Sequence, residues 1–170
     1  MLDKHILLMY TSAYQLGRID SIMSKFHIYQ IDMNDPVNKD CVLQLYFKTY
    51  PDNNERYSLD RLEDELSSQS GWNYRTFFAA NIGCQLVGIG AIKAADWASN
   101  THIMYLSAVH EESRGMGIGT ALEHARIEYV KQSFSCGRIL VSTKHSKRFQ
   151  KHGFSDVSHI AGRHMMCLEF

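Results

Sequence analysis

The stretch YLSAVHEESRGMGIGTALEHARIEYVKQ, residues 105–132, determines how the rest of the chain is interpreted. It predicts a strand, then a tight loop with glycines at positions 115, 117 and 119, and then a helix. A loop of this kind gathers unpaired backbone amides at the positive end of a helix dipole, where phosphate oxygens bind well. The stretch therefore predicts a site for a phosphate-bearing ligand.

Two well-known phosphate-binding motifs fail on spacing. The dinucleotide pattern GxGxxG needs a third glycine where Thr120 stands, and the next strand ends without an acid for a ribose. The P-loop pattern needs a lysine directly after its last glycine, and none follows Gly119. A turn without any ligand is the remaining structural alternative.

Hydrophobic periodicity extends the prediction outward from the loop. Asp35 and Pro36 are typical of a helix start, and Pro51 marks the end of that helix. We expect the order β-α-α-β-β-β-α-β-α-β-β, an α/β fold with a mixed central sheet and helices on both faces. The expected elements cover residues 27–32, 36–51, 58–69, 75–81, 84–96, 101–109, 118–132, 137–143, 144–153, 154–161 and 163–170.

The helix after the glycine loop is expected to be amphipathic. Its buried stripe is predicted to contain Ile118, Ala121, Leu122, Ala125 and Tyr129. Its solvent face is predicted to carry Glu123, Arg126, Glu128 and Lys131. The strand that follows this helix should return parallel to the strand that precedes the loop.

Composition argues against several classes of partner and of site. The 170 residues suit one domain, and 18 basic residues balance 18 acidic ones, which disfavours nucleic-acid and membrane partners. The four cysteines have no metal-ligand spacing, and neither do the scattered histidines, so we expect no metal site. We interpret the cysteines as buried free thiols in a reducing cytoplasm.

The first 26 residues are predicted to form a helical extension of a single domain that covers residues 27–170. Ile19, Ile22, Met23 and Phe26 recur at helical spacing. This apolar face must pack on the domain or on a partner subunit, so a homodimer is one expected arrangement.

Two segments carry a resemblance to a known family. Residues 109–119 resemble motif A of the GCN5-related N-acetyltransferase (GNAT) family, Q/R-x-x-G-x-G/A, in which Arg114, Gly117 and Gly119 fill the pattern and Gly115 is also typical. The later segment STKHSKRFQKHGF is similar to the family's N-x-x-A-x-x-F-Y-x-K-x-G-F, with matches at Lys151, Gly153 and Phe154. The resemblance covers roughly residues 27–170.

The resemblance implies a GNAT-like fold and acetyl-CoA as cosubstrate. Its pyrophosphate would be held by the loop residues Arg114, Gly115, Met116, Gly117, Ile118, Gly119 and Thr120. A bulge in the preceding strand would fall on Ser107, Ala108 and Val109, so Ala108 and Val109 would contact the pantetheine arm, with the Val109 amide as oxyanion donor. Ser142, where the family has Asn, and Phe149 complete the expected cofactor-binding set.

Catalytic proton transfer departs from the family pattern. The position at which the family commonly has a tyrosine acid is Phe149, which cannot donate a proton. Tyr105, His145 and Ser146 are the candidates that remain. Alternation along the strand places Tyr105 on one face with Ile103 and Ser107, where it acts through water or is simply a packed tyrosine.

The expected function is acetyl transfer to an amine by direct attack on the thioester. Residues 46–74 combine aromatics with acids, which suits a cationic acceptor such as a small-molecule amine or a protein amine. Lys144, Lys147, Arg148 and Lys151 either meet the 3'-phosphate of CoA or form an ordinary exposed helix face. The alternatives are a regulatory acyl-CoA-binding module without catalysis, and an acyltransferase with a macromolecular acceptor such as a protein lysine or a charged tRNA.

Overall fold

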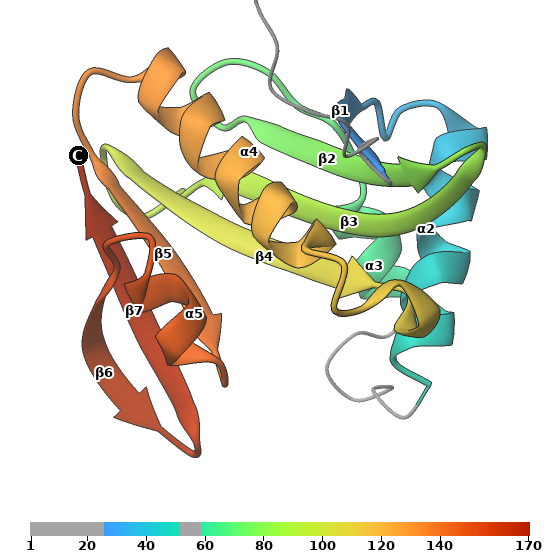
Figure 1. Cartoon of the computed structure of the whole chain (residues 1–170). Helices are drawn as coiled ribbons and strands as arrows, with labels where there is room; N and C mark the ends of the chain where they lie inside the picture. Colours follow the sequence, from blue (N-terminus) through green and yellow to red (C-terminus); the bar gives the residue numbers. More distant parts are fainter. Residues whose placement is uncertain (1–25, 52–58) are drawn as a thin grey trace, which may run out of the picture.

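The described residues contain one seven-stranded sheet of order β1-β2-β3-β4-β5-β7-β6 (Figure 1). The computed structural model describes residues 26–51 and 59–170. The predicted helical extension therefore lies outside the described residues, except for Phe26, which packs against the core. The strands are β1 (His27–Ile31), β2 (Arg75–Ile82), β3 (Gln85–Ala94), β4 (Thr101–Val109), β5 (Arg138–Thr143), β6 (Ser155–Ile160) and β7 (Arg163–Glu169).

The helices cover both faces of the sheet, as predicted (Figure 1). They are α2 (Pro36–Thr49), α3 (Leu59–Glu65), α4 (Ile118–Ser133) and α5 (Ser146–Gln150), with a 3₁₀ turn η2 (Glu111–Ser113) before α4. Helix α2 begins where expected because the side chain of Asp35 accepts a hydrogen bond from the Val37 amide, and Pro36 occupies its first turn. The predicted order of strands and helices is confirmed.

Two hydrophobic clusters sandwich the sheet. The α2-side core joins Val42 and Leu45 of α2 and Leu62 of α3 to Phe77 and Ile89 of the sheet. The α4-side core contains Phe78, Ile92, Met104, Ile118, Leu122, Val130 and Phe149. Strands β2 and β3 alternate their side chains between the two clusters, which is why their central residues are apolar on both faces.

The sheet separates at the junction between β4 and β5 (Figure 1). These strands are parallel, as predicted, and pair only over Thr101 to Met104 and Arg138 to Val141. Beyond Met104, β4 continues beside β3, whereas β5 turns away with β7 and β6. A space therefore opens between the ends of two strands that began side by side.

A bulge in β4 overturns one prediction. Leu106 has a left-handed φ of 46°, and the pairing of β3 with β4 shifts between Ile89 and Ala91. Tyr105 packs edge-to-face on Phe77 in the α2-side core, whereas Ser107 Oγ accepts a hydrogen bond from Arg126 of α4. The expectation that Tyr105 and Ser107 share one face is wrong because the extra residue of the bulge reverses the alternation.

The predicted solvent face of α4 is also partly wrong. Glu128 and Lys131 are exposed as expected, but Glu123 and Arg126 are 0% and 1% exposed. Glu123 is covered by the side chains of Arg148 on α5 and of His152 just beyond it, and Arg126 lies against the sheet over Gly90. Charged side chains enter this interface because oppositely charged or polar partners meet them there.

The cysteine prediction needs a similar correction. All four are free, but Cys41, Cys84 and Cys136 are exposed, and only Cys167 is buried. Cys84 lies in the turn that joins β2 to β3, and Cys136 lies between α4 and β5. Their apolar sequence context therefore reflected neighbouring strands and helices rather than burial of the thiols.

Leu122 tests the packing of α4 on the sheet. Its side chain is 1% exposed and lies in the α4-side core. Leu122→Ala is expected to lower the free energy of unfolding by about 2–5 kcal/mol, because it leaves a cavity under the helix. Urea denaturation measures this, with Glu128→Ala on the exposed face of α4 as control. If Leu122→Ala lowered the free energy of unfolding no more than the control does, the packing described would be contradicted.

Candidate active site

A cleft of about 1350 Å³ occupies the space that opens between β4 and β5. Its described lining includes one carboxylate, from Glu65, and seven cationic side chains, from Arg61, Lys93, Arg114, Arg126, Lys144, Arg148 and Arg163. The cleft is therefore strongly basic, although the net charge of the whole chain is zero. Such a cleft attracts a polyanionic ligand.

The glycine loop forms one wall of this cleft. Gly115 and Gly117 have left-handed φ angles of 80° and 87°, which glycine adopts without strain. Gly117 caps α4 without a side-chain hydrogen bond, and the first bond of the helix runs from the Ala121 amide to the Gly117 carbonyl. The amides at 118, 119 and 120 therefore have no partner within the helix and point toward the cleft end of α4.

The predicted cofactor-binding residues of the loop lie together. Arg114, Gly115, Gly117, Ile118, Gly119 and Thr120 all line the cleft. Met116 does not; its half-buried side chain packs against the α4-side core. Ile118 is 1% exposed, so it also anchors the first turn of α4 in the core.

The end of β4 presents a free strand edge to the cleft. Ala108 is buried and pairs with Ile89, and the amide of His110 donates to the Val87 carbonyl of β3 at 2.8 Å. Because successive amides of an extended strand point to opposite edges, the Val109 amide points away from β3. The Val109 carbonyl shares this edge and accepts a hydrogen bond from Arg114 Nε at 3.3 Å.

The β5 wall carries the other predicted residues. The side-chain and backbone oxygens of Ser142 accept hydrogen bonds from Arg163 at 3.1 and 2.8 Å. Phe149 is 3% exposed and packs edge-to-face on Phe154. His145 is exposed and lines the cleft, whereas Ser146, in the first turn of α5, is not among the described residues that line it.

Arg148 closes the inner end of the β5 wall. Its Nε lies 2.9 Å from a carboxylate oxygen of Glu123, and its guanidinium lies over the Phe149 ring. Burial raises the pKa of the Glu123 carboxyl above its ordinary value, and the charges of Arg148, His152 and Arg126 partly offset this rise. Of the predicted basic cluster, Arg148 is therefore the half-buried ion-pair partner of a fully buried carboxylate, and Lys144, Lys147 and Lys151 are exposed.

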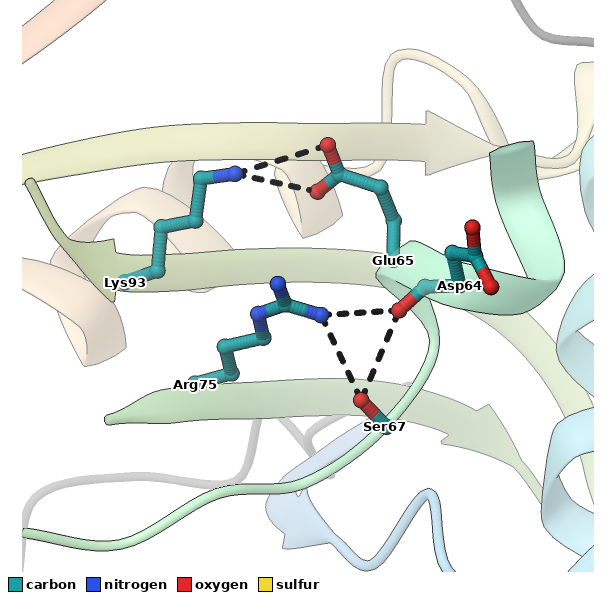
Figure 2. Close-up of polar contacts among 5 residues, drawn as sticks. All are labelled: Asp64, Glu65, Ser67, Arg75 and Lys93. Carbon is teal, nitrogen blue, oxygen red and sulfur yellow. Dashed lines mark hydrogen bonds and ion pairs between the residues drawn. The ribbon is translucent and has the colours of Figure 1, made fainter. Parts of the chain in front are cut away.

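A second polar group lies at the α3 end of the cleft (Figure 2). Lys93 Nζ lies 3.2 and 3.4 Å from the two carboxylate oxygens of Glu65, and 4.8 Å above the centre of the Tyr105 ring. Arg75 donates to the Asp64 carbonyl and to Ser67 Oγ, which holds the C-terminal end of α3 against the sheet. This places the Glu65 carboxylate on the opposite side of the bulge from α4.

Comparison with known proteins identifies the family. Residues 40–154 match the model of the acetyltransferase (GNAT) family. The chain belongs to this family. GNAT proteins use acetyl-CoA, and the free amides of the glycine loop together with the basic cleft fit its charged diphosphate.

Solved structures share the GNAT fold at low sequence identity. ElaA of Escherichia coli has a TM-score of 0.68 at 13% identity, over 84% of this chain and 98% of that chain. The PaiA N-acetyltransferase of Thermoplasma acidophilum, solved with coenzyme A, has a TM-score of 0.67 at 16% identity, over 85% of this chain and 99% of that chain. An aminoglycoside 6'-acetyltransferase type Ii has a TM-score of 0.68 at 21% identity, over 84% of this chain and 96% of that chain.

No curated protein sequence matches this GNAT chain significantly. None of the helices within the described ranges is long and apolar enough to cross a bilayer.

Sequence reasoning missed three residues of this GNAT cleft. Glu65 is one of several acids within residues 46–74, and nothing local distinguishes it from Glu63, which is exposed on the same helix. The Tyr50 hydroxyl donates to the Ser107 carbonyl at 3.0 Å and so meets the bulge directly. Arg126 was placed in solvent, although its position one helical turn after Leu122 was a signal that it flanks the buried stripe.

Tyr105 tests whether a phenol transfers protons in this site. Burial raises the pKa of the Tyr105 hydroxyl, so it is a poor base at neutral pH, and the oxygen has no hydrogen-bond partner among the described residues. Tyr105→Phe is expected to leave kcat within about twofold of wild type and to keep or raise Tm, because an unsatisfied buried hydroxyl costs about 1–3 kcal/mol. Steady-state kinetics and thermal unfolding measure both. A loss of kcat of tenfold or more would restore Tyr105 as a proton-transfer residue.

Proposed function

We propose that this GNAT protein is an N-acetyltransferase, in which an amine attacks the thioester carbonyl of acetyl-CoA directly. The observation that carries the proposal is the arrangement around the bulge of β4. The free amides of α4 lie on one side of it, and the only carboxylate of the described cleft lining lies on the other. An anionic cosubstrate and an amine can therefore approach one strand edge from two directions.

The glycine loop and the strand edge position the donor. The amides of Ile118, Gly119 and Thr120 bind diphosphate oxygens, and the exposed cationic side chains of the cleft, Arg114 and Lys144, neutralise their charge. The Val109 amide, which points away from β3, donates a hydrogen bond to the carbonyl oxygen as negative charge develops on it. A preorganised donor of this kind is a major contribution to acyl transfer.

Glu65 is the proposed general base. An alkylamine has a pKa of about 10 and is mostly protonated at neutral pH, so it must lose a proton before it can attack. The Glu65 carboxylate lines the cleft with 19% of its side chain exposed, so it accepts this proton directly or through one water molecule. Lys93 holds the carboxylate in place.

The leaving group needs no acid in this proposal. Phe149 cannot donate a proton, and Ser146 is not among the described lining residues. A thiol with a pKa of about 8.5 gives a thiolate that leaves without assistance at moderate cost. His145 lines the cleft and remains the proposed residue for any protonation of the departing sulfur.

The proposed acceptor is a small molecule with a primary amine, or a protein amino terminus. Tyr46, Tyr50 and Trp97 supply aromatic surface to this end of the cleft. The acidic lining expected from the sequence is reduced to Glu65 within the described residues, since Glu63 and Asp64 are exposed and do not line the cleft. This favours an amine of modest charge over a strongly cationic one.

Location and assembly remain part of the proposal. Four free cysteines, three of them exposed, suit a reducing compartment such as the cytoplasm. The homodimer proposed from residues 1–26 depends on a segment of which only Phe26 lies within the described ranges. Sedimentation of the full chain and of a chain lacking those residues tests it, and an unchanged oligomeric state would remove the segment as a dimer element.

Calorimetric titration tests the proposed function. Acetyl-CoA and CoA are titrated into the full chain, with NAD and ATP as comparators, and a panel of primary amines is then assayed for thiol release. Selective micromolar binding of both acetyl-CoA and CoA, together with turnover on at least one amine, supports the proposal. Binding without turnover favours the regulatory acyl-CoA-binding alternative. No binding means that the glycine loop is only a turn.

A further inference from the structure

Arg126 reaches from α4 to the bulge of β4 through the interior of the protein. It is 1% exposed, and its Nε donates to the Leu122 carbonyl of its own helix at 2.9 Å. Its Nη1 donates to Ser107 Oγ at 2.9 Å and to the Ala91 carbonyl at 3.3 Å. One guanidinium nitrogen therefore links β4 to β3 at the point where their pairing is irregular.

Gly90 provides the space for this guanidinium. A Cβ atom at Gly90 would lie 2.9 Å from Arg126 Cζ, closer than packed atoms approach. Gly90 is also the β3 residue opposite the bulge, since Ile89 pairs with Ala108 and Ala91 pairs with Tyr105. A bulge leaves local ladder groups unpaired, and Arg126 supplies donors at this interruption.

The burial of Arg126 carries a desolvation penalty that a neutral link between the two strands would avoid. Burial lowers the pKa of its guanidinium to about 10, although Glu123 acts in the opposite direction, so the side chain remains a cation at neutral pH. Desolvating a cation opposes folding, and hydrophobic residues of similar volume commonly replace buried charges without loss of stability. Stability alone therefore does not account for an arginine here.

The bulge is also the part of β4 that faces the cleft. Ser107 lies two residues before Val109, the proposed oxyanion donor. Its carbonyl accepts a hydrogen bond from the Tyr50 hydroxyl, which approaches from the other side of the sheet. Arg126 itself contributes to the floor of the cleft. The Ser107 residue is thus held from both faces of the sheet, by Tyr50 on its carbonyl and by Arg126 on its side chain.

We propose that Arg126 is a positioning residue for acyl transfer, which holds the bulge so that the Val109 amide points at the thioester carbonyl. The inference rests on the proposed function of the cleft, because it assumes that a thioester binds there. It assigns Arg126 no contact with substrate. Its effect passes through Ser107 and the backbone of β4.

The test uses acetyl-CoA labelled with ¹³C at the acetyl carbonyl, bound to the full chain. Wild type, Arg126→Met and Ser107→Ala are compared, with Lys131→Met as a control that removes an exposed cation from the same helix. Calorimetry gives the dissociation constant, the ¹³C resonance reports polarisation of the carbonyl, and thermal unfolding gives Tm. The kcat is measured with the best amine of the panel.

In wild type and Lys131→Met we expect the carbonyl resonance to move downfield on binding. Arg126→Met should bind acetyl-CoA with nearly unchanged affinity and keep or raise Tm, yet lose most of this shift. Its kcat should fall by about 10²-fold, the effect expected when reacting groups are misplaced by about 1 Å. Ser107→Ala removes one hydrogen bond to a charged partner and should lower kcat by about tenfold.

The outcomes separate the inference from the proposed function. If wild type does not bind acetyl-CoA, the proposed function is wrong and the inference falls with it. If Arg126→Met binds and shows the wild-type resonance and kcat, Arg126 is only structural and the inference alone is overturned. If Arg126→Met does not fold, Ser107→Ala decides, and wild-type values for that variant overturn the inference.

Discussion

Replacement of Glu65 by glutamine is expected to lower kcat for amine acetylation by about 10²- to 10⁴-fold, the usual contribution of a general base. Glutamine keeps the size of the side chain and can still accept a hydrogen bond from Lys93, but it cannot take a proton from an ammonium group. Affinity for acetyl-CoA should hardly change, because the glycine loop lies on the other side of the bulge. A thiol-release assay with the best amine of the panel measures kcat, and calorimetry measures binding.

Glu63→Gln is the matched control for this prediction. Glu63 lies on the same helix and is exposed, and its backbone carbonyl accepts a hydrogen bond from Lys39 Nζ. The control should retain wild-type kinetics at every pH. The loss of kcat in Glu65→Gln should become smaller as the pH approaches the pKa of the amine, since the unprotonated amine then forms without a catalytic base. Equal activity of Glu65→Gln and wild type at neutral pH would show that another group removes the proton.

Gly119→Glu is expected to weaken acetyl-CoA binding by about 10²-fold or more. Gly119 lies in the first turn of α4, and a glutamate there brings a carboxylate beside the amides that we propose bind the diphosphate. Two like charges about 4 Å apart repel by about 4 kcal/mol at an effective dielectric constant of about 20. The new Cβ would lie 3.3 Å from Arg148 Nη1, so the end of this side chain must shift slightly to make room for it.

The same substitution should not weaken the fold. A carboxylate in the first turn interacts favourably with the helix dipole, and glutamate has a higher helix propensity than glycine. We therefore expect a Tm equal to or above the wild-type value together with lost binding. Gln132→Glu, which adds the same charge at the far end of α4, is the control and should bind acetyl-CoA normally. Wild-type affinity in Gly119→Glu would mean that this turn does not hold the diphosphate.

Local sequence signals were sufficient for the order and the type of the elements. The predicted strand 101–109 has the same bounds as β4, and the Asp35–Pro36 start of α2 was found from its cap. Such signals depend on residues within one turn or one strand of each other. The glycine loop was predictable for the same reason, because unpaired amides at the start of a helix follow from the local pattern alone.

The errors occurred at an irregularity of one strand and at helix positions that distant residues cover. Alternation along β4 placed Tyr105 and Ser107 together until the bulge at Leu106 separated them. Helical spacing placed Glu123 and Arg126 in solvent, although the sheet and α5 cover them. Their burial depends on Gly90 and Arg148, which lie more than 20 positions away in the chain. No local period contains that information.

The amino-acid sequence by itself determined the element order, the parallel return after the loop and the glycine-rich start of α4 with its free amides, since each depends on backbone preferences of neighbouring residues. Only the tertiary structure decided that Glu65 meets Lys93, 28 positions later, and that Arg126 meets Ser107, 19 positions earlier. The physical reason is that a charged side chain enters an interior only where its partners converge. That convergence is a property of the assembled sheet and its helices.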